Sequence, residues 1–355
     1  MLVGMVDQSI GPFLRARVAF ERRGLHFVLG QPWLATKLAA SRAARVDGQT
    51  LDSELAVMLA LDDIASRSDL RGLSPKQARA RVAGEVLVVD APAPAGIVSA
   101  DRRIPGPAGE IELRTYTPAD VAAPSPGVVY IHGGGWVTGS IETHDGLCRR
   151  IAAIGRCRVV SVEYRLAPEH PFPAAAEDSV AAARWVLANA EELGMEPSRI
   201  AVAGDSAGGN LSAVVALKTR ADARRPALQV LLYPALDGTC SSPSYTTFAE
   251  RYFLTAAMCD WYYAHYAGTT DRKTPDLSPL FAPEPSDVPA LISIACWDPL
   301  RDEGRAYAER LRKAGTPVVV QELPDLVHGF ALMTGACRRA REATESLIRT
   351  MMQHL

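Results

Sequence analysis

The sequence predicts an α/β protein whose mostly parallel sheet is covered by helices on both faces. Three observations carry this prediction. Short apolar strands alternate with helical stretches from Gly96 onward, glycine-rich turns directly follow two of the strands, and the first ninety or so residues have a helical pattern. In such sheets, binding and catalytic sites form at the carboxyl ends of the strands.

Composition limits the class of protein. A chain of 355 residues, 48% hydrophobic and 22% charged, suggests a globular protein with two domains or one large domain with insertions. Its net charge of -2, from 38 basic and 40 acidic residues, gives no electrostatic reason to expect a nucleic acid or an anionic membrane surface as partner. We find no signal-peptide pattern and no apolar run of the roughly 18 residues that span a membrane, so we expect a cytoplasmic protein.

Six cysteines are spread along the chain without CxxC spacing, at Cys148, Cys157, Cys240, Cys259, Cys296 and Cys337. Such spacing is unlike that of structural metal sites, and reduced, mostly buried thiols are the expected state. We therefore expect no metal site.

The N-terminal region, residues 1–95, is expected to be helical. Three segments have the apolar spacing of helices: 11–23, 51–66 and 74–87. Ser74 is a suitable N-cap for the last of them, and Pro75 suits its first helical position. The segment PAPAG (92–96) then interrupts the pattern.

The catalytic core is expected over 96–237 and 288–355. Two strands flank the turn at 105–107 as a hairpin, and later strands are expected at 127–131, 157–164, 199–205, 228–234, 290–296 and 317–323. Helices are expected between and after them at 145–155, 174–193, 207–220, 302–314 and 336–353.

Residues 238–287 interrupt this alternation. They contain no clear strand, and eight of the 23 aromatic residues of the chain fall between Tyr245 and Tyr266. Such an insertion could be core packing or a lid over an apolar pocket, and the two interpretations are compatible. We expect it to contribute to a helical cap, together with the N-terminal region.

The segment RIAVAGDSAGG predicts a nucleophile. A strand leads into Gly204-Asp205-Ser206-Ala207-Gly208 and then into a helix. G-x-S-x-G at a strand-to-helix turn is the pattern of a nucleophile elbow, in which glycines two positions either side of the serine avoid collisions. Ser206 would then protrude, and the N–H of Ala207 could donate to an anion at the helix start. A glycine-rich turn without chemistry is the alternative.

A serine nucleophile needs a base, and in this arrangement the order along the chain is serine, acid, histidine. Only His265, His328 and His354 follow Ser206. His354 is the penultimate residue, and His265 lies in the aromatic insertion. His328 lies a few residues beyond a predicted strand, where a loop can present an imidazole, and is our candidate base.

The acid that orients this imidazole should end the preceding strand. Asp298 follows ALISIACW directly, and Pro299 ends the strand. Asp302 and Glu303 suit the acidic first turn of the next helix instead. We therefore expect Asp298 to orient His328.

The glycines of YIHGGGWVTG predict an oxyanion hole. Gly133, Gly134 and Gly135 follow a strand, where backbone N–H groups free of side chains can approach a substrate closely. We expect Gly134, Gly135 and Ala207 to donate to the oxyanion, Gly133 to make the turn, and His132 to support the loop.

A dinucleotide-binding pattern is the rival interpretation. Gly133, Gly135 and Gly139 match it loosely, and Glu163 at the end of the next strand could bind a ribose. The expected helix begins only near Asp145, however, and the rival leaves the serine, acid and histidine unexplained.

These motifs together resemble the hormone-sensitive-lipase-like family of α/β-hydrolases, in particular its bacterial carboxylesterases. The matching segments are HGGGW (132–136), YRLAPEHPFPAA (164–175), GDSAGG (204–209), DPLRDEG (298–304) and HGF (328–330). The resemblance implies an α/β-hydrolase fold with an eight-stranded core sheet and a helical cap. We expect YRLAPEHPFPAA to shape a loop, and His144 and Asp145 to cap a helix or, as the alternative, to line the acyl or alcohol side of the site. The resemblance alone suggests that the protein could form a homodimer.

The resulting hypothesis is a serine carboxylesterase that hydrolyses small to medium acyl esters without metal or organic cofactor. A non-catalytic small-molecule receptor on the same fold is a second class, although such a receptor would be expected to lose a member of the triad. An amidase or a transacylase would use the same three residues.

Overall fold

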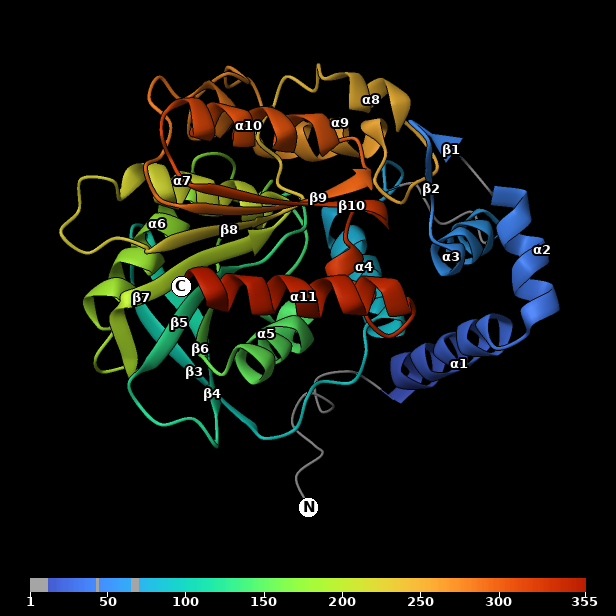
Figure 1. The fold of residues 1–355 in the computed structure, drawn as a ribbon, viewed down its shortest axis with the longest axis horizontal. Coiled ribbons are helices and arrows are strands. Elements are labelled where there is room, and N and C mark those ends of the chain that lie inside the picture. The colour runs from blue at the N-terminus through green and yellow to red at the C-terminus, as the bar shows by residue number, and fades with distance from the viewer. Residues whose placement is uncertain (1–11, 43–44, 65–69) are drawn as a thin grey trace.

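An eight-stranded, mostly parallel sheet forms the centre of the molecule in this computed structural model, which describes residues 12–42, 45–64 and 70–355 (Figure 1). The strand order is β10-β9-β8-β7-β5-β6-β4-β3, and only β4 pairs antiparallel, with β3 and with β6. The strands are β3 (Ile97–Gly106), β4 (Gly109–Pro118), β5 (Ser125–Ile131), β6 (Arg158–Glu163), β7 (Met195–Asp205), β8 (Leu228–Leu232), β9 (Ala290–Trp297) and β10 (Val318–Val327). The predicted fold class is confirmed.

Helices cover both faces of this sheet because successive strand residues point to opposite sides. In β5, Val128 and Tyr130 pack in the cluster under α5 (Ile141–Gly155) and α11 (Arg338–His354). The alternate residues Val129 and Ile131 pack under the helices of the other face. Those helices are α6 (Ala174–Ala188), α7 (Ala207–Lys218) and α10 (Arg301–Lys313). The central strands β5, β8 and β9 are therefore buried on both faces, as their apolar sequences predict.

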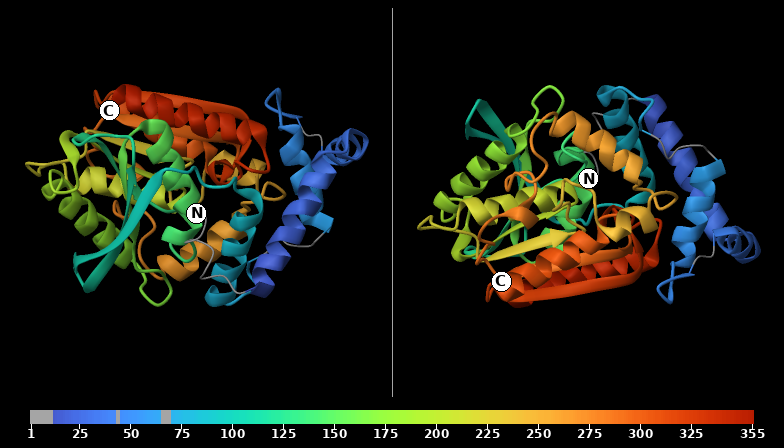
Figure 2. Two further views of the ribbon diagram at one scale, coloured as in Figure 1. Left: turned by 90° about the horizontal axis from the view of Figure 1, so that it is seen from below. Right: turned by 90° about the horizontal axis from the view of Figure 1, so that it is seen from above.

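Four helices form the described N-terminal region: α1 (Pro12–Leu29), α2 (Pro32–Arg42), α3 (Ser53–Ile64) and α4 (Pro75–Val89). Ser74 caps α4 in a capping box with Gln77, as the sequence predicts. Helix α2 and the short hairpin of β1 (Arg45–Val46) and β2 (Gln49–Thr50) were not predicted. Figures 1 and 2 show α1 and α2 at one end of the molecule, outside α3 and α4.

The insertion 238–287, described throughout, contains helices and no strand. It holds α8 (Pro243–Thr247), α9 (Ala256–Tyr266) and a 3₁₀ turn (Pro279–Phe281); a second 3₁₀ turn (Phe330–Leu332) follows β10. Tyr245, Phe248 and Tyr266 are buried in the core clusters, so part of the aromatic content is packing. Within the part of the chain that the structure describes, no helix combines the length and apolar character needed to cross a membrane.

Candidate active site

Ser206 lies on a sharp turn between β7 and α7. Its backbone has a positive φ of 54° with ψ -118°, which non-glycine residues rarely adopt, and its N–H donates to the carbonyl of Leu232 at 2.8 Å. A Cβ on Gly204 would collide with the backbone of Gly208 and Ile131, and one on Gly208 would collide with the carbonyl oxygen of Ile131. The glycines at these two positions are therefore required by close backbone approach.

A continuous hydrogen-bonded chain joins Ser206, His328 and Asp298. Nε2 of His328 lies 2.9 Å from Oγ of Ser206, and Nδ1 lies 2.7 Å from Oδ2 of Asp298. Oδ1 of Asp298 accepts the N–H of Leu300 at 2.9 Å, which holds this buried carboxylate in place. Because the carboxylate accepts the Nδ1 proton, Nε2 is left to accept the proton of the hydroxyl.

The other histidines considered from the sequence lie elsewhere. His265 is on α9, where its Nδ1 lies 2.8 Å from the carbonyl of Trp261. His354 is the last residue of α11. His132 is completely buried beneath the loop of Gly133, Gly134 and Gly135, called the glycine loop below. Burial, as the main cause, and the neighbouring His144, as the second, lower the pKa of His132 to about 3. His132 is therefore neutral at physiological pH.

The glycine loop has backbone conformations that side chains rarely adopt. Gly134 has φ 117° and Gly135 has φ 59°. A Cβ on Gly134 would collide with the backbone of Thr138, and one on Gly135 would enter the ring of Tyr262. His132 lies under the loop, with Nδ1 2.8 Å from the carbonyl of Gly133. The backbone of this loop can approach the region above Ser206 only because it lacks side chains.

Asp205 connects the turn at Ser206 to the glycine loop. Its Oδ1 accepts the N–H of Gly133 at 3.0 Å and the hydroxyl of Tyr130 at 2.8 Å, and lies 3.1 Å from Nε2 of His144. Burial by itself would raise the pKa of this carboxyl, but His144 and the hydrogen bonds outweigh burial and hold the pKa below its ordinary value. No role of Asp205 was predicted from the sequence; its place beside Ser206 was the only available signal.

Two expectations from the sequence are wrong. Helix α5 begins at Ile141 with Ser140 as its N-cap, four residues earlier than expected. His144 and Asp145 neither cap that helix nor line the pocket: both are buried within it, and Asp145 pairs with Arg149 at 2.7 Å.

The dinucleotide interpretation requires Glu163 to bind a ribose, but the structure uses this carboxyl elsewhere. Oε2 of Glu163 accepts the N–H of Ile141 at 2.7 Å, at the start of α5, and burial raises the pKa of this carboxyl to about 7. Because it already accepts this hydrogen bond, the carboxyl is not available to bind a ribose.

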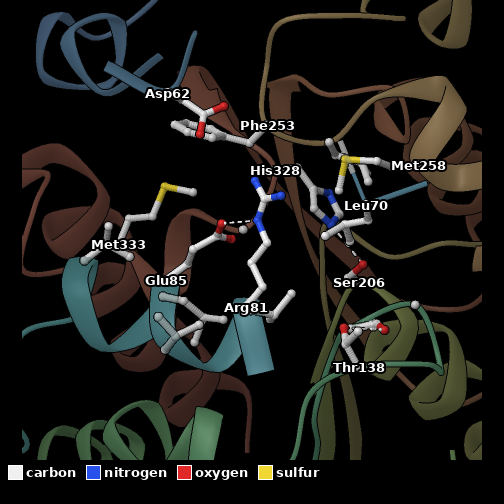
Figure 3. A pocket seen from close by; sticks show the side chains of 18 of the residues that line it. Asp62, Leu70, Arg81, Glu85, Thr138, Ser206, Phe253, Met258, His328 and Met333 are labelled. Carbon is white, nitrogen blue, oxygen red and sulfur yellow. Dashed lines mark hydrogen bonds and ion pairs between the residues drawn. The ribbon is translucent and has the colours of Figure 1, made fainter. Parts of the chain in front are cut away.

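The serine and histidine face a pocket of about 610 Å³, within the usual range for small-molecule sites. Figure 3 shows Ser206 and His328 at its side, and Leu70, Met258 and Met333 among its other walls. The walls come from α1, α3, α4, the 238–287 insertion and the loop after β10. Most of the lining side chains are apolar, which suits an acyl chain or an apolar alcohol.

Arg79 on α4 connects the N-terminal region to the core beside the glycine loop. Its guanidinium donates to the carbonyls of Val137 and Ala167, both at 2.8 Å, and pairs with Glu169 at 2.6 Å. The hydrogen bond from Arg79 holds the pKa of Glu169 at about 2. The YRLAPEH segment thus supplies an anchor for α4.

Replacing Arg79 with alanine is expected to lower the free energy of unfolding by about 1.5–3 kcal/mol, the usual worth of hydrogen bonds to a charged group. The two carbonyls would also lose their donor. Arg103→Ala is the matched control, because Arg103 is exposed on β3 and pairs only loosely with Glu110 at 3.6 Å. Urea denaturation of both variants measures the difference; equal midpoints would contradict the anchoring role.

Comparison with known proteins agrees with this fold. Residues 128–332 match the model of a family described by the alpha/beta hydrolase fold. The chain is 41% identical over 350 residues to "Carboxylic ester hydrolase LipN" of Mycobacterium tuberculosis, covering 91% of this chain and 89% of that protein. It is 46% identical over 242 residues to "Carboxylesterase NlhH" of the same species, covering 66% of this chain and 76% of that protein.

A solved structure shares the fold over most of its length. The ester-hydrolase EH1AB1 from the metagenome of Lake Arreo has a TM-score of 0.82 and 41% identity, covering 86% of this chain and 99% of that one. The sequence identity, the shared fold and the positions of the motifs all indicate the same family. The chain belongs to the hormone-sensitive-lipase-like family of α/β-hydrolase enzymes.

Proposed function

We propose that the protein is a serine carboxylesterase that hydrolyses short- to medium-chain acyl esters through an acyl-enzyme intermediate. The observation that carries this proposal is the hydrogen-bonded chain from Ser206 through His328 to Asp298 at the edge of an apolar pocket. The names of relatives matched over most of their length, such as the LipN hydrolase, support the same reaction class.

In the proposed reaction, Oγ of Ser206 attacks the ester carbonyl while Nε2 of His328 takes the hydroxyl proton. Asp298 holds the imidazole in the required tautomer and stabilises the imidazolium. The proton then passes to the departing alcohol, which leaves the acyl group on the serine. A water activated by the same histidine releases the acid and restores Ser206.

The oxyanion of each tetrahedral intermediate is expected to accept the N–H groups of Gly134, Gly135 and Ala207. Two features support this assignment: the glycine loop approaches without side chains, and Ala207 is the first residue of α7, where the helix dipole favours an anion. One such donor is typically worth about 10²- to 10³-fold in kcat. Nucleophile, base and oxyanion donors all come from the chain, so the reaction requires no cofactor.

We propose that 1–95 and 238–287 act together as a cap over the site. The described parts of both segments contribute pocket walls, including Leu25 of α1, Val86 of α4 and Tyr262 of α9. A pocket of about 610 Å³ with these apolar walls accommodates a short or medium acyl chain.

A fluorophosphonate probe tests the proposal, because it reacts with an activated serine and mimics the tetrahedral intermediate. We expect one equivalent of label, located on Ser206 by peptide mass analysis. Ser206→Ala should remain unlabelled, and Ser198→Ala, at an exposed serine, should label as the unmodified protein does. A protein that folds and stays unlabelled would instead be the receptor alternative. With a labelled enzyme, partition of the acyl group between water and an added alcohol distinguishes a hydrolase from a transacylase.

A further inference from the structure

The described N-terminal helices expose large apolar side chains. The exposed large hydrophobic residues of the described chain are Phe20, Phe27, Trp33, Ile64 and Val98, and four of these five precede residue 65. Phe20 is 78% exposed, Phe27 is 64% exposed and Trp33 is 69% exposed. Single exposed apolar residues are normal, but a group of exposed aromatic residues on two consecutive helices indicates a surface that contacts a partner.

Helix α1 has two distinct faces. Its inner residues Leu25 and Val28 line the pocket, and Arg22 donates to the carbonyls of Val88 and Asp90 at the end of α4. Phe20 and Phe27 are seven residues apart, so they lie on one stripe of α1, and both are exposed rather than lining the pocket. The contacts of α1 with the pocket and with α4 therefore do not explain why these two aromatic residues are present.

Positive charge accompanies these aromatic residues. Together α1 and α2 contain six Lys or Arg residues and a single acidic residue, Glu21, within a chain whose net charge is -2. Arg17, Arg23 and Lys37 are exposed. The net charge of the whole chain gave no reason to expect an anionic membrane as partner, because acidic residues elsewhere balance the excess of basic residues in α1 and α2.

We propose that the outer face of α1 and the start of α2, formed by Phe20, Arg23, Phe27, Trp33 and Lys37, is a docking surface for anionic lipid. Aromatic side chains partition into the headgroup region, and basic side chains are attracted to anionic headgroups. The two features together match an interfacial element that lies on a membrane surface without crossing it.

The position of this docking surface favours lipid over a second copy of the chain. In a twofold contact the same patch would meet itself, and the basic side chains would face one another. On lipid, by contrast, these side chains would face anionic headgroups, and α1, whose inner side lines the pocket that reaches Ser206, would lie between that pocket and the lipid. Figures 1 and 2 show α1 and α2 at the end of the molecule, where a flat surface can reach them.

Flotation with vesicles tests the proposal. We expect the protein to float with vesicles that mix phosphatidylcholine and phosphatidylglycerol, to bind pure phosphatidylcholine weakly, and to lose binding as salt rises. The double variant Arg23→Gln/Lys37→Gln should bind the mixed vesicles about 30-fold more weakly. The triple variant Phe20→Ser/Phe27→Ser/Trp33→Ser should lose most of its binding.

Val98→Ser/Arg103→Gln is the matched control, because it removes an exposed apolar and an exposed basic side chain from β3. It should bind the vesicles normally, and all variants should hydrolyse soluble p-nitrophenyl acetate at the unmodified rate, which shows that they are folded. Equal binding of all variants, or no binding by the unmodified protein, would overturn the proposal. A shift from dimer to monomer in the triple variant would overturn it as well, in favour of a contact between copies. Flotation requires no turnover, so this result is independent of the proposed reaction.

Discussion

Replacing Ser206 with alanine is expected to lower kcat for p-nitrophenyl ester hydrolysis by about 10⁴- to 10⁶-fold. Alanine has no hydroxyl to attack the carbonyl or to form the acyl-enzyme. What remains is water attack assisted by the proposed oxyanion donors and by binding in the pocket. Steady-state hydrolysis of p-nitrophenyl acetate and butyrate measures the loss.

The alanine variant should fold as the unmodified protein does. Serine and alanine are strained alike at a φ of 54°, and the backbone bond from residue 206 to Leu232 survives the substitution. Ser198→Ala serves as the control for loss of an unrelated serine. If Ser206→Ala kept more than a tenth of the activity, another residue would have to be the nucleophile.

Replacing Asp298 with asparagine is expected to lower kcat by about 10⁴-fold. The amide can occupy the same volume and still accept the N–H of Leu300, but its NH₂ group can donate to Nδ1 of His328. The imidazole would then carry its proton on Nε2, 2.9 Å from Oγ of Ser206, and could no longer accept the hydroxyl proton.

Asp302→Asn is the matched control for this experiment, since Asp302 was the competing carboxylate in the sequence. It lies in the first turn of α10, accepts the N–H of Ser244 at 2.9 Å and pairs with Arg301 at 2.8 Å. We expect it to change kcat less than about tenfold, since it has no bond to the imidazole. Equal losses in the two variants would rule out a specific role for Asp298.

Much of the fold could be predicted because its strands have a simple signature. Strands β5, β6, β8 and β9 of the parallel part are largely buried, so they appear in the sequence as mostly apolar runs. Their predicted positions agree with the structure to within a few residues. Helix α2 and the hairpin of β1 and β2 were missed. Their patterns are short, and α2 has a weak separation of apolar and polar faces.

Other features could not be predicted because they depend on contacts between distant segments. Asp205 meets Tyr130 and Gly133 across more than seventy residues, and Arg79 meets Glu169 across ninety. A carboxylate beside a serine, or an arginine on a helix, has many possible partners. Only the folded chain selects one of them.

The sequence by itself determined the strand-to-helix turn at Ser206 and the loop without side chains at Gly134 and Gly135. A backbone that passes this close to its neighbours admits only glycine, and the glycines can be read directly from the sequence. The tertiary structure alone decided that His328 comes within hydrogen-bonding distance of that serine and Asp298 within hydrogen-bonding distance of His328. It alone decided also that some residues of α1 line the pocket while Phe20 and Phe27 are exposed. The physical reason is that distance between side chains remote in sequence is set by how the sheet and helices pack, and no local pattern records it.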